Sequence, residues 1–91
     1  MYGIIRTYKY DKTDGETIVR VVREGFVPLV ESHEGFVDYH WIDSGDGEGA
    51  SMAIFTTKEA AEESTFLAGG FVHEKLKDLL KTVPHVIEGE L

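Results

Sequence analysis

The sequence predicts an α+β fold in which helices cover one face of a four-stranded antiparallel sheet. Four segments are rich in β-branched and aromatic residues, as strands are. Two longer segments repeat apolar residues at helical spacing, and the order along the chain is strand, helix, strand, strand, helix, strand. We expect a single domain, residues 1–91, because chains this short rarely divide into two hydrophobic cores.

The first strand and the first helix are expected within the first third of the chain. Residues 1–10 are β-branched and aromatic and predict a strand. Thr13 and Glu16 have the spacing of a capping box, which predicts that the helix begins there. Pro28 has no amide hydrogen to donate, so the helix is expected to break near Gly25 and restart as a short second piece.

The middle of the chain predicts a pair of strands. Gly35 can adopt the left-handed conformation that ends a helix, so the helical region is expected to stop there. A second strand at 36–43 then leads into the acidic, glycine-rich segment 44–49, where three glycines permit a tight reversal. The third strand is expected at 50–56.

The last third of the chain predicts a helix followed by a final strand. Thr56 and Glu59 repeat the capping-box spacing and mark the expected helix start. Two glycines at 69–70 predict a kink or a close backbone approach, since each costs about 1 kcal/mol relative to alanine in a helix. Pro84 ends the helical region, and residues 85–91 form the expected last strand.

This order is the β-α-β-β-α-β arrangement of the ferredoxin-like fold, which leaves one sheet face without helices. Alternation along the second strand predicts that each of its faces carries large apolar side chains. The expected faces are Val37, Tyr39 and Trp41 on one side, and Phe36, His40 and Ile42 on the other. Since a solvated face should be mainly polar, we expect a second copy of the chain to cover it and form a homodimer.

Composition excludes several classes of function. The net charge is -8, and the nine Lys and Arg residues are scattered, which argues against nucleic acid and anionic membrane surfaces as partners. The chain has no Cys, so it tolerates a reducing compartment. It opens MYGIIRTYKY, which has no pattern of a secretory signal, and a cytoplasmic location is the expectation.

Four runs of residues carry a family resemblance across nearly the whole chain: EGFVPLVESHEGFVDYHWIDSGDGEG, AIFTTKEAAEES, FLAGGFVHEKL and VIEGEL. Their pattern of glycines, strand ends and helix starts resembles the antibiotic biosynthesis monooxygenase domain family of dimeric α+β barrels. The resemblance implies a homodimer with a pocket between sheet and helices in each subunit. It also implies cofactor-free oxygenation of phenolic or quinone-forming compounds.

A second branch of this family degrades haem and relies on an Asn, a Trp and a His. This chain contains no Asn, Ser64 lies where that branch has its Trp, and His73 is only near the position of the His. Haem degradation is therefore not expected. An Asn is also prominent in the polyketide oxygenase site, so that site cannot be copied onto this chain residue for residue.

A cofactor-free oxygenase needs an apolar pocket with one or two groups that transfer protons. His73 is the candidate base and Arg6 the candidate stabiliser of an anion. The candidate substrate-binding residues are Tyr8, Tyr39, Trp41, Phe66 and Phe71. In the competing interpretation the aromatic residues pack the core or a dimer interface, His73 lies on the surface, and Arg6 pairs with an acidic residue.

Two further features have structural explanations that outweigh chemical ones. His40 and Asp38 lie two apart on one strand, where a structural hydrogen bond is commoner than a proton-transfer pair. The acidic segment 43–48 lacks the ligand order of a calcium-binding loop and is expected to be a solvated turn.

Two functions remain open. One is a homodimeric, cofactor-independent monooxygenase that acts on an aromatic or quinone-type substrate, with no cofactor and no metal. The other is a non-enzymatic ligand-binding or interaction protein of the same fold.

Overall fold

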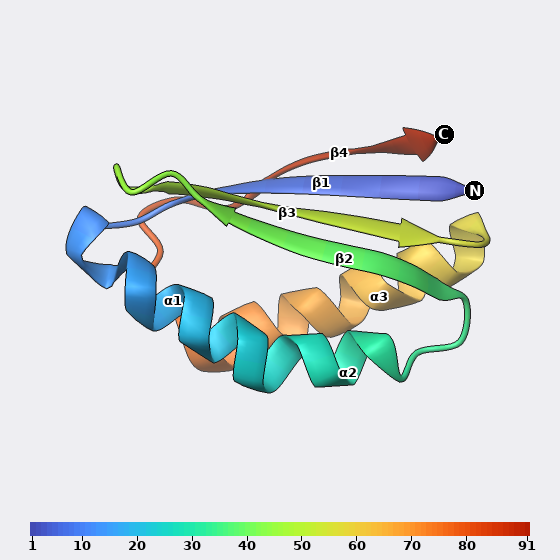
Figure 1. Cartoon of the computed structure of the whole chain (residues 1–91), viewed down its shortest axis with the longest axis horizontal. Coiled ribbons are helices and arrows are strands. Elements are labelled where there is room, and N and C mark those ends of the chain that lie inside the picture. The colour runs from blue at the N-terminus through green and yellow to red at the C-terminus, as the bar shows by residue number, and fades with distance from the viewer.

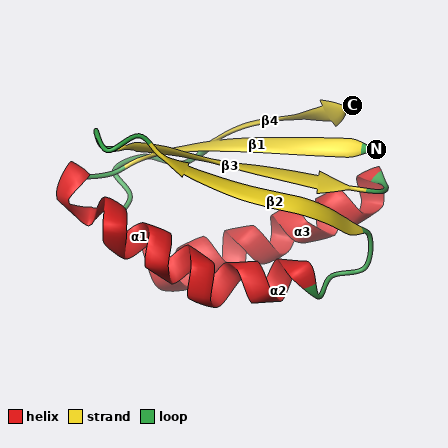
Figure 2. Cartoon of the chain, viewed as in Figure 1, coloured by secondary structure: helices red, strands yellow, loops and turns green.

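The computed structural model describes all 91 residues and places four strands in one antiparallel sheet, with helices on one side of it (Figure 1). The strands are β1 (Tyr2–Lys9), β2 (Phe36–Asp43), β3 (Glu48–Phe55) and β4 (His85–Glu90), and their order across the sheet is β2-β3-β1-β4. Figure 2 shows the two layers, with the upper face of the sheet free of helices. The predicted ferredoxin-like arrangement is confirmed.

The core lies between the sheet and the helices. Side chains alternate along β1, so that Tyr2, Ile4, Arg6 and Tyr8 point toward the helices and are buried. Its apolar members are Tyr2, Ile4, Tyr8, Tyr10, Ile18, Val22, Phe26, Val30, Ala53, Phe55, Ala60, Ala61, Ala68 and Leu76.

The first helical region begins with a short 3-10 turn, Lys12–Asp14, which leads directly into α1 (Gly15–Val21). Its cap differs from the expected one. The carboxylate of Asp11 accepts hydrogen bonds from the backbone amide of Thr13 at 2.9 Å and from its hydroxyl at 2.7 Å. The hydroxyl of Thr13 is thus engaged by Asp11, and the expected capping box does not form.

The interruption expected in this helix takes the form of a π-helical turn. After Val22–Phe26 the chain continues as α2 (Val27–Glu31), whose first amide donates to the carbonyl of the first residue of the turn. Pro28 lies at the start of α2, where a missing amide hydrogen removes no hydrogen bond within that helix. The chain therefore stays helical through Gly25 instead of breaking.

The second helix, α3 (Lys58–Phe71), also differs in detail from the expectation. Its cap is Thr57, one residue later than predicted, and the hydroxyl of Thr57 accepts from the amide of Ala60 at 3.1 Å. The glycines at 69–70 neither kink α3 nor touch another segment, since a methyl group added at either would meet nothing within 4 Å. A second π-helical turn, Val72–Leu76, follows the helix.

The close approach between the helices occurs instead at Gly25. A Cβ atom at this position would lie 2.8 Å from Cε1 of Phe71, so only glycine lets the two helices come together without adjustment. The ring of Phe71 also packs on Phe26, with ring centres 5.5 Å apart.

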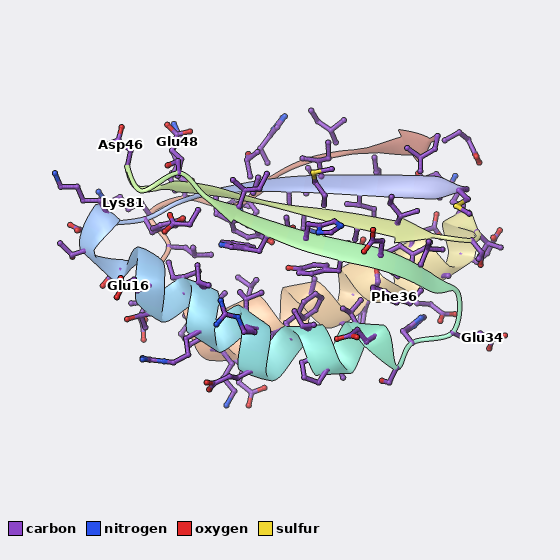
Figure 3. All side chains as sticks on the ribbon, in the orientation of Figure 1. Glu16, Glu34, Phe36, Asp46, Glu48 and Lys81 are labelled. Atoms are coloured by element: carbon purple, nitrogen blue, oxygen red, sulfur yellow. The ribbon has the colours of Figure 1, made fainter.

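A β-bulge at the start of β2 changes the expected division of its faces. Phe36 pairs with Phe55 and Asp38 pairs with Ile54, so Val37 is the extra residue. Phe36 therefore lies under the sheet on the side of Tyr39 and packs edge-on against Phe55, with ring centres 6.2 Å apart (Figure 3). The expectation that Phe36 shares a face with His40 was wrong because a bulge shifts alternation by one residue.

The sheet face without helices carries a row of side chains from all four strands, which we call the open face. Met52 pairs with both His40 and Ile5, and Ile5 pairs with Ile87. Met52 and Ile5 are 40% and 41% exposed and Ile87 is 60% exposed. Ile42, further along β2, is 53% exposed.

Candidate functional site

A cavity of about 580 Å³ lies between the sheet, the second half of α3 and the segment before β4. We call it the main cavity. Its apolar wall includes Ala68, Val72, Leu80, Val83 and Val86. Its polar residues are Arg6, Tyr8, Thr65, His73, Lys77, Lys81 and Thr82. Its volume is within the range of small-molecule sites, which is about 300–1,000 Å³.

Arg6 is the buried charge of the main cavity. Alternation along β1 turns this side chain into the core, where only 5% of it is exposed. Its guanidinium donates to the hydroxyl oxygen of Thr65 at 2.8 Å, and that hydroxyl donates to the carbonyl of Ala61 at 3.1 Å. No carboxylate forms a salt bridge with Arg6, so the competing interpretation, in which Arg6 pairs with an acidic residue, is wrong.

A buried cation without a carboxylate partner is costly, because the protein interior solvates charge poorly. A buried ionisable group beside a cavity is thus a candidate for a functional site. Arg6 is therefore the strongest single sign of a binding site in this structure.

Tyr8 lies next to Arg6 on the same face of β1 and is 5% exposed. Burial raises the pKa of Tyr8, and the positive charge of Arg6 offsets this effect only in part. The phenol therefore stays protonated near neutral pH and can donate a hydrogen bond. Its ring stacks obliquely on Trp41, with ring centres 5.1 Å apart.

Behind these two residues lies a much smaller void of about 10 Å³, the inner void, lined by Arg6, Tyr8, Tyr39, Trp41 and Phe71 among others. Its volume is close to that of a single water molecule. Burial raises the pKa of Tyr39, and the neighbouring phenol of Tyr8 raises it further. The indole N–H of Trp41 is buried and has no hydrogen-bond partner.

Ser51 of β3 adds another polar group to this region. Its hydroxyl lies near the phenols of Tyr8 and Tyr39 and favours their ionised forms slightly, although it makes no hydrogen bond of good geometry. Its side chain is nevertheless 1% exposed. The two buried side-chain polar atoms without a hydrogen-bond partner, the indole N–H of Trp41 and the hydroxyl of Ser51, thus belong to residues that pair across β2 and β3.

The structure places the predicted site residues in three positions. Arg6, Tyr8 and His73 line the main cavity, and His73 is an exposed residue at its rim. Tyr39 and Trp41 line the inner void, as does Phe71. Phe66 is 85% exposed and belongs to neither space.

Phe66 therefore does not fit the expectation of a substrate-binding residue or of a core residue. The buried face of α3 carries Ala60, Ala61, Ser64 and Ala68. Phe66 is two residues from Ser64 and from Ala68, and a helix turns by about 200° over two residues, so it points away from the sheet.

Sequence reasoning missed Thr65, Lys77 and Lys81. Thr65 gave no signal, because a threonine inside a helix has no special spacing. Lys77 and Lys81 are individually ordinary surface residues, and only the fold brings them to one cavity with Arg6.

The other candidates have structural roles. Nε2 of His40 lies 2.9 Å from the carboxylate of Asp38, and this hydrogen bond lowers the pKa of Asp38. Both side chains are exposed to solvent, so the pair lacks the enclosed environment of a proton-transfer site. At the end of β2, the carboxylate of Asp43 accepts from the hydroxyl of Tyr10 at 2.7 Å, while Asp46 in the following turn points away from the helices (Figure 3).

Fold and site together define a small α+β protein with a partly apolar cavity whose volume matches that of small-molecule sites. Solved structures share this fold over nearly their whole length. A protein of unknown function from Nitrosomonas europaea has a TM-score of 0.84 at 12% identity, covering 99% of this chain and 87% of that chain. A monooxygenase from Streptomyces coelicolor, solved with nanaomycin D, has a TM-score of 0.82 at 17% identity, covering 99% and 86%.

The cofactor-independent oxygenase SnoaB of Streptomyces nogalater, in a mutant form, has a TM-score of 0.69 at 14% identity, covering 99% of this chain and 91% of that chain. No family model and no curated protein matches the sequence. The chain thus has the fold of the antibiotic biosynthesis monooxygenase-like proteins. None of its helices is long and apolar enough to cross a membrane.

Proposed function

We propose that this protein binds a small aromatic molecule in the main cavity and oxidises it with O2, without metal or flavin. The observation that carries the proposal is a cavity of about 580 Å³ into which a buried arginine without a carboxylate partner is directed. Oxygenases of the same fold, one of them cofactor-independent, support the reaction class.

The chemistry fits a phenol with a free position opposite its hydroxyl group. His73 takes up the phenolic proton, directly or through water, and the positive charge of Arg6 in the same cavity favours the phenolate. The electron-rich ring then forms a carbon–oxygen bond with O2, and the resulting peroxide takes up a proton. Loss of water breaks the ring C–H bond and the O–O bond, so phenol and O2 give quinone and one water.

Tyr8 and Tyr39 are suited to a supporting part in this reaction. Burial raises the pKa of both phenols, so both stay protonated and can donate hydrogen bonds without competing as anions. The aromatic wall between them and Trp41 keeps bulk water from the inner end of the site.

A homodimer is part of the proposal. The open face carries Met52, Ile5, Ile87 and Ile42, each at least 40% exposed. A second copy packed on this face would remove the apolar row from water and close the barrel. The proposal places the protein in the cytoplasm, whose reducing conditions a chain without Cys tolerates.

A non-enzymatic ligand carrier of the same shape is the second candidate, and the exposure of His73 favours it. An exposed histidine is a poor base for a reaction that must exclude water. A carrier would use the same cavity and the same arginine but would leave the ligand unchanged.

Oxygen uptake with a panel of substituted phenols and 1-naphthols, each with a free position opposite its hydroxyl group, separates the two candidates. The oxygenase predicts uptake of one O2 per quinone formed, above the rate without protein. His73→Ala should lower the rate by about 10²-fold or more, as loss of a general base does. Lys75→Ala is the matched control, because Lys75 lies outside the cavity and pairs with Glu74 at 4.0 Å. If no panel member is oxidised, the carrier is the better description.

A further inference from the structure

The charges of the chain are distributed unequally between its surface and the main cavity. Acidic residues outnumber basic ones, 17 to nine. Three of those nine, Arg6, Lys77 and Lys81, line the main cavity together with His73. None of the acidic residues lines it. The cavity is therefore electropositive within an acidic protein.

Among these positive groups, Arg6 is the one that can bind a ligand at a defined position. It is 5% exposed, has no carboxylate partner, and makes its one side-chain hydrogen bond to Thr65. A guanidinium carries five N–H donors arranged as a planar fork, so donors remain for a ligand. Carboxylates match this fork with two parallel hydrogen bonds.

We propose that the main cavity selects an organic anion, a flat apolar molecule with one carboxylate that pairs with Arg6. This inference rests on the proposed function in locating the ligand, and it adds the chemical class of that ligand. The apolar wall formed by Val72, Leu80 and Val86 receives the hydrocarbon body, and the buried arginine receives the charge.

Lys77 and Lys81 have a separate part in this arrangement. Both are exposed residues of the cavity lining, so water screens them, and each contributes little to the affinity of a bound ligand. Their field instead offsets the repulsion that an anion meets when it approaches a chain of net charge -8. They raise the association rate, whereas Arg6 sets the affinity.

The position of Arg6 excludes a purely structural explanation for the positive charge. Lys77 and His73 lie near the end of a helical segment, where cations interact favourably with the helix dipole. That explanation does not apply to Arg6, which is in the middle of a strand and is buried without an ion pair.

Calorimetric titration with 2-naphthoate and its neutral isostere 2-naphthamide tests the inference. The pair has the same ring system and differs in charge. We expect naphthoate to bind the intact protein at least about tenfold more tightly, as charge-assisted pairs with arginine do. The single indole N–H signal, that of Trp41, should shift in the NMR spectrum, because its ring touches Tyr8 at the cavity.

Arg6→Met is the decisive variant, since methionine fills a similar volume without charge. It should lower the affinity for naphthoate to that for naphthamide and leave naphthamide binding unchanged. Arg6→Met removes a buried charge that has no ion partner, and with it the desolvation cost of that charge, so the variant should fold. Lys77→Met should slow naphthoate association, whereas Lys75→Met, two residues away and outside the cavity, should not.

Equal binding of the acid and the amide, or unchanged naphthoate affinity in Arg6→Met, would overturn the inference. If Arg6→Met does not fold, the salt dependence of the intact protein decides: naphthoate affinity must fall as salt rises, and naphthamide affinity must not. Titration with 2-naphthalenesulfonate and 2-naphthyl phosphate distinguishes carboxylate from other anions, and tighter binding of either overturns the carboxylate assignment. A preference for the carboxylate without oxygen uptake would rule out the oxygenase and leave this inference intact. Oxygen uptake without that preference would rule out this inference and leave the oxygenase intact.

Discussion

The buried phenols of Tyr8 and Tyr39 make the stability of the fold depend on pH in the alkaline range. Burial raises the pKa of each above the ordinary value of 10.0. The unfolded chain releases these protons near pH 10, whereas the folded chain retains them to higher pH. Their contribution to stability is therefore fully present below about pH 10 and is lost as the pH rises toward the folded-state values.

The free energy of unfolding should fall above about pH 10 by up to about 1.4 kcal/mol per pH unit for each such tyrosine. Urea denaturation followed by circular dichroism at pH 8 to about pH 11 measures the slope. Tyr39→Phe should make the slope shallower, because one of these phenols is removed. A free energy that stays constant over this range would contradict the burial of these phenols.

At the scale of helices, two glycines that look alike in sequence have opposite roles. A methyl group at Gly25 would lie 2.8 Å from Cε1 of Phe71, while a methyl group at Gly70 would meet nothing within 4 Å. Gly70→Ala should stabilise the protein by about 0.5–1 kcal/mol through helix propensity. Gly25→Ala gains the same propensity, but overcrowding, at about 1–3 kcal/mol, should outweigh it.

Urea denaturation of the two variants measures this difference directly. Phe71→Leu in the Gly25→Ala background is the control, because leucine lacks the outer ring atoms that the new methyl group would meet. It should remove most of the unfavourable interaction between the two positions. Equal effects of the two alanine substitutions would show that the helices are not in contact at Gly25.

At the scale of the whole molecule, the open face is an apolar surface that a single chain leaves exposed to water. The proposed homodimer predicts a particle of twice the 10.2 kDa chain mass in sizing chromatography with light scattering. Met52→Glu should shift it toward the mass of a single chain, because a buried carboxylate without a partner would lie at the interface. Phe66→Glu, on the outward side of α3, should not.

A monodisperse particle of single-chain mass for the unaltered protein would contradict the homodimer. A Met52→Glu variant that still forms the dimer would mean that the interface lies elsewhere. The first result would also leave the apolar row of the open face without an explanation.

The order of strands and helices, their approximate bounds and the ferredoxin-like arrangement were determined by the sequence alone. These features depend on local periodicity, on glycine and proline, and on polar residues at turns, all of which act over a few positions. The same local rules placed the helix caps only to within a residue or two, because Asp11, Thr13, Thr56 and Thr57 offer competing oxygens.

Only the tertiary structure decided which residues form the site. The bulge at Val37 sets which side chains of β2 face the helices, and one extra residue reverses the alternation before it. Arg6 was recognised in the sequence, but its lack of an ion pair was not, since that depends on where 17 carboxylates are placed in space. Lys77 and Lys81 join Arg6 only because the fold brings β1, the end of the second helical region and the segment before β4 around one cavity.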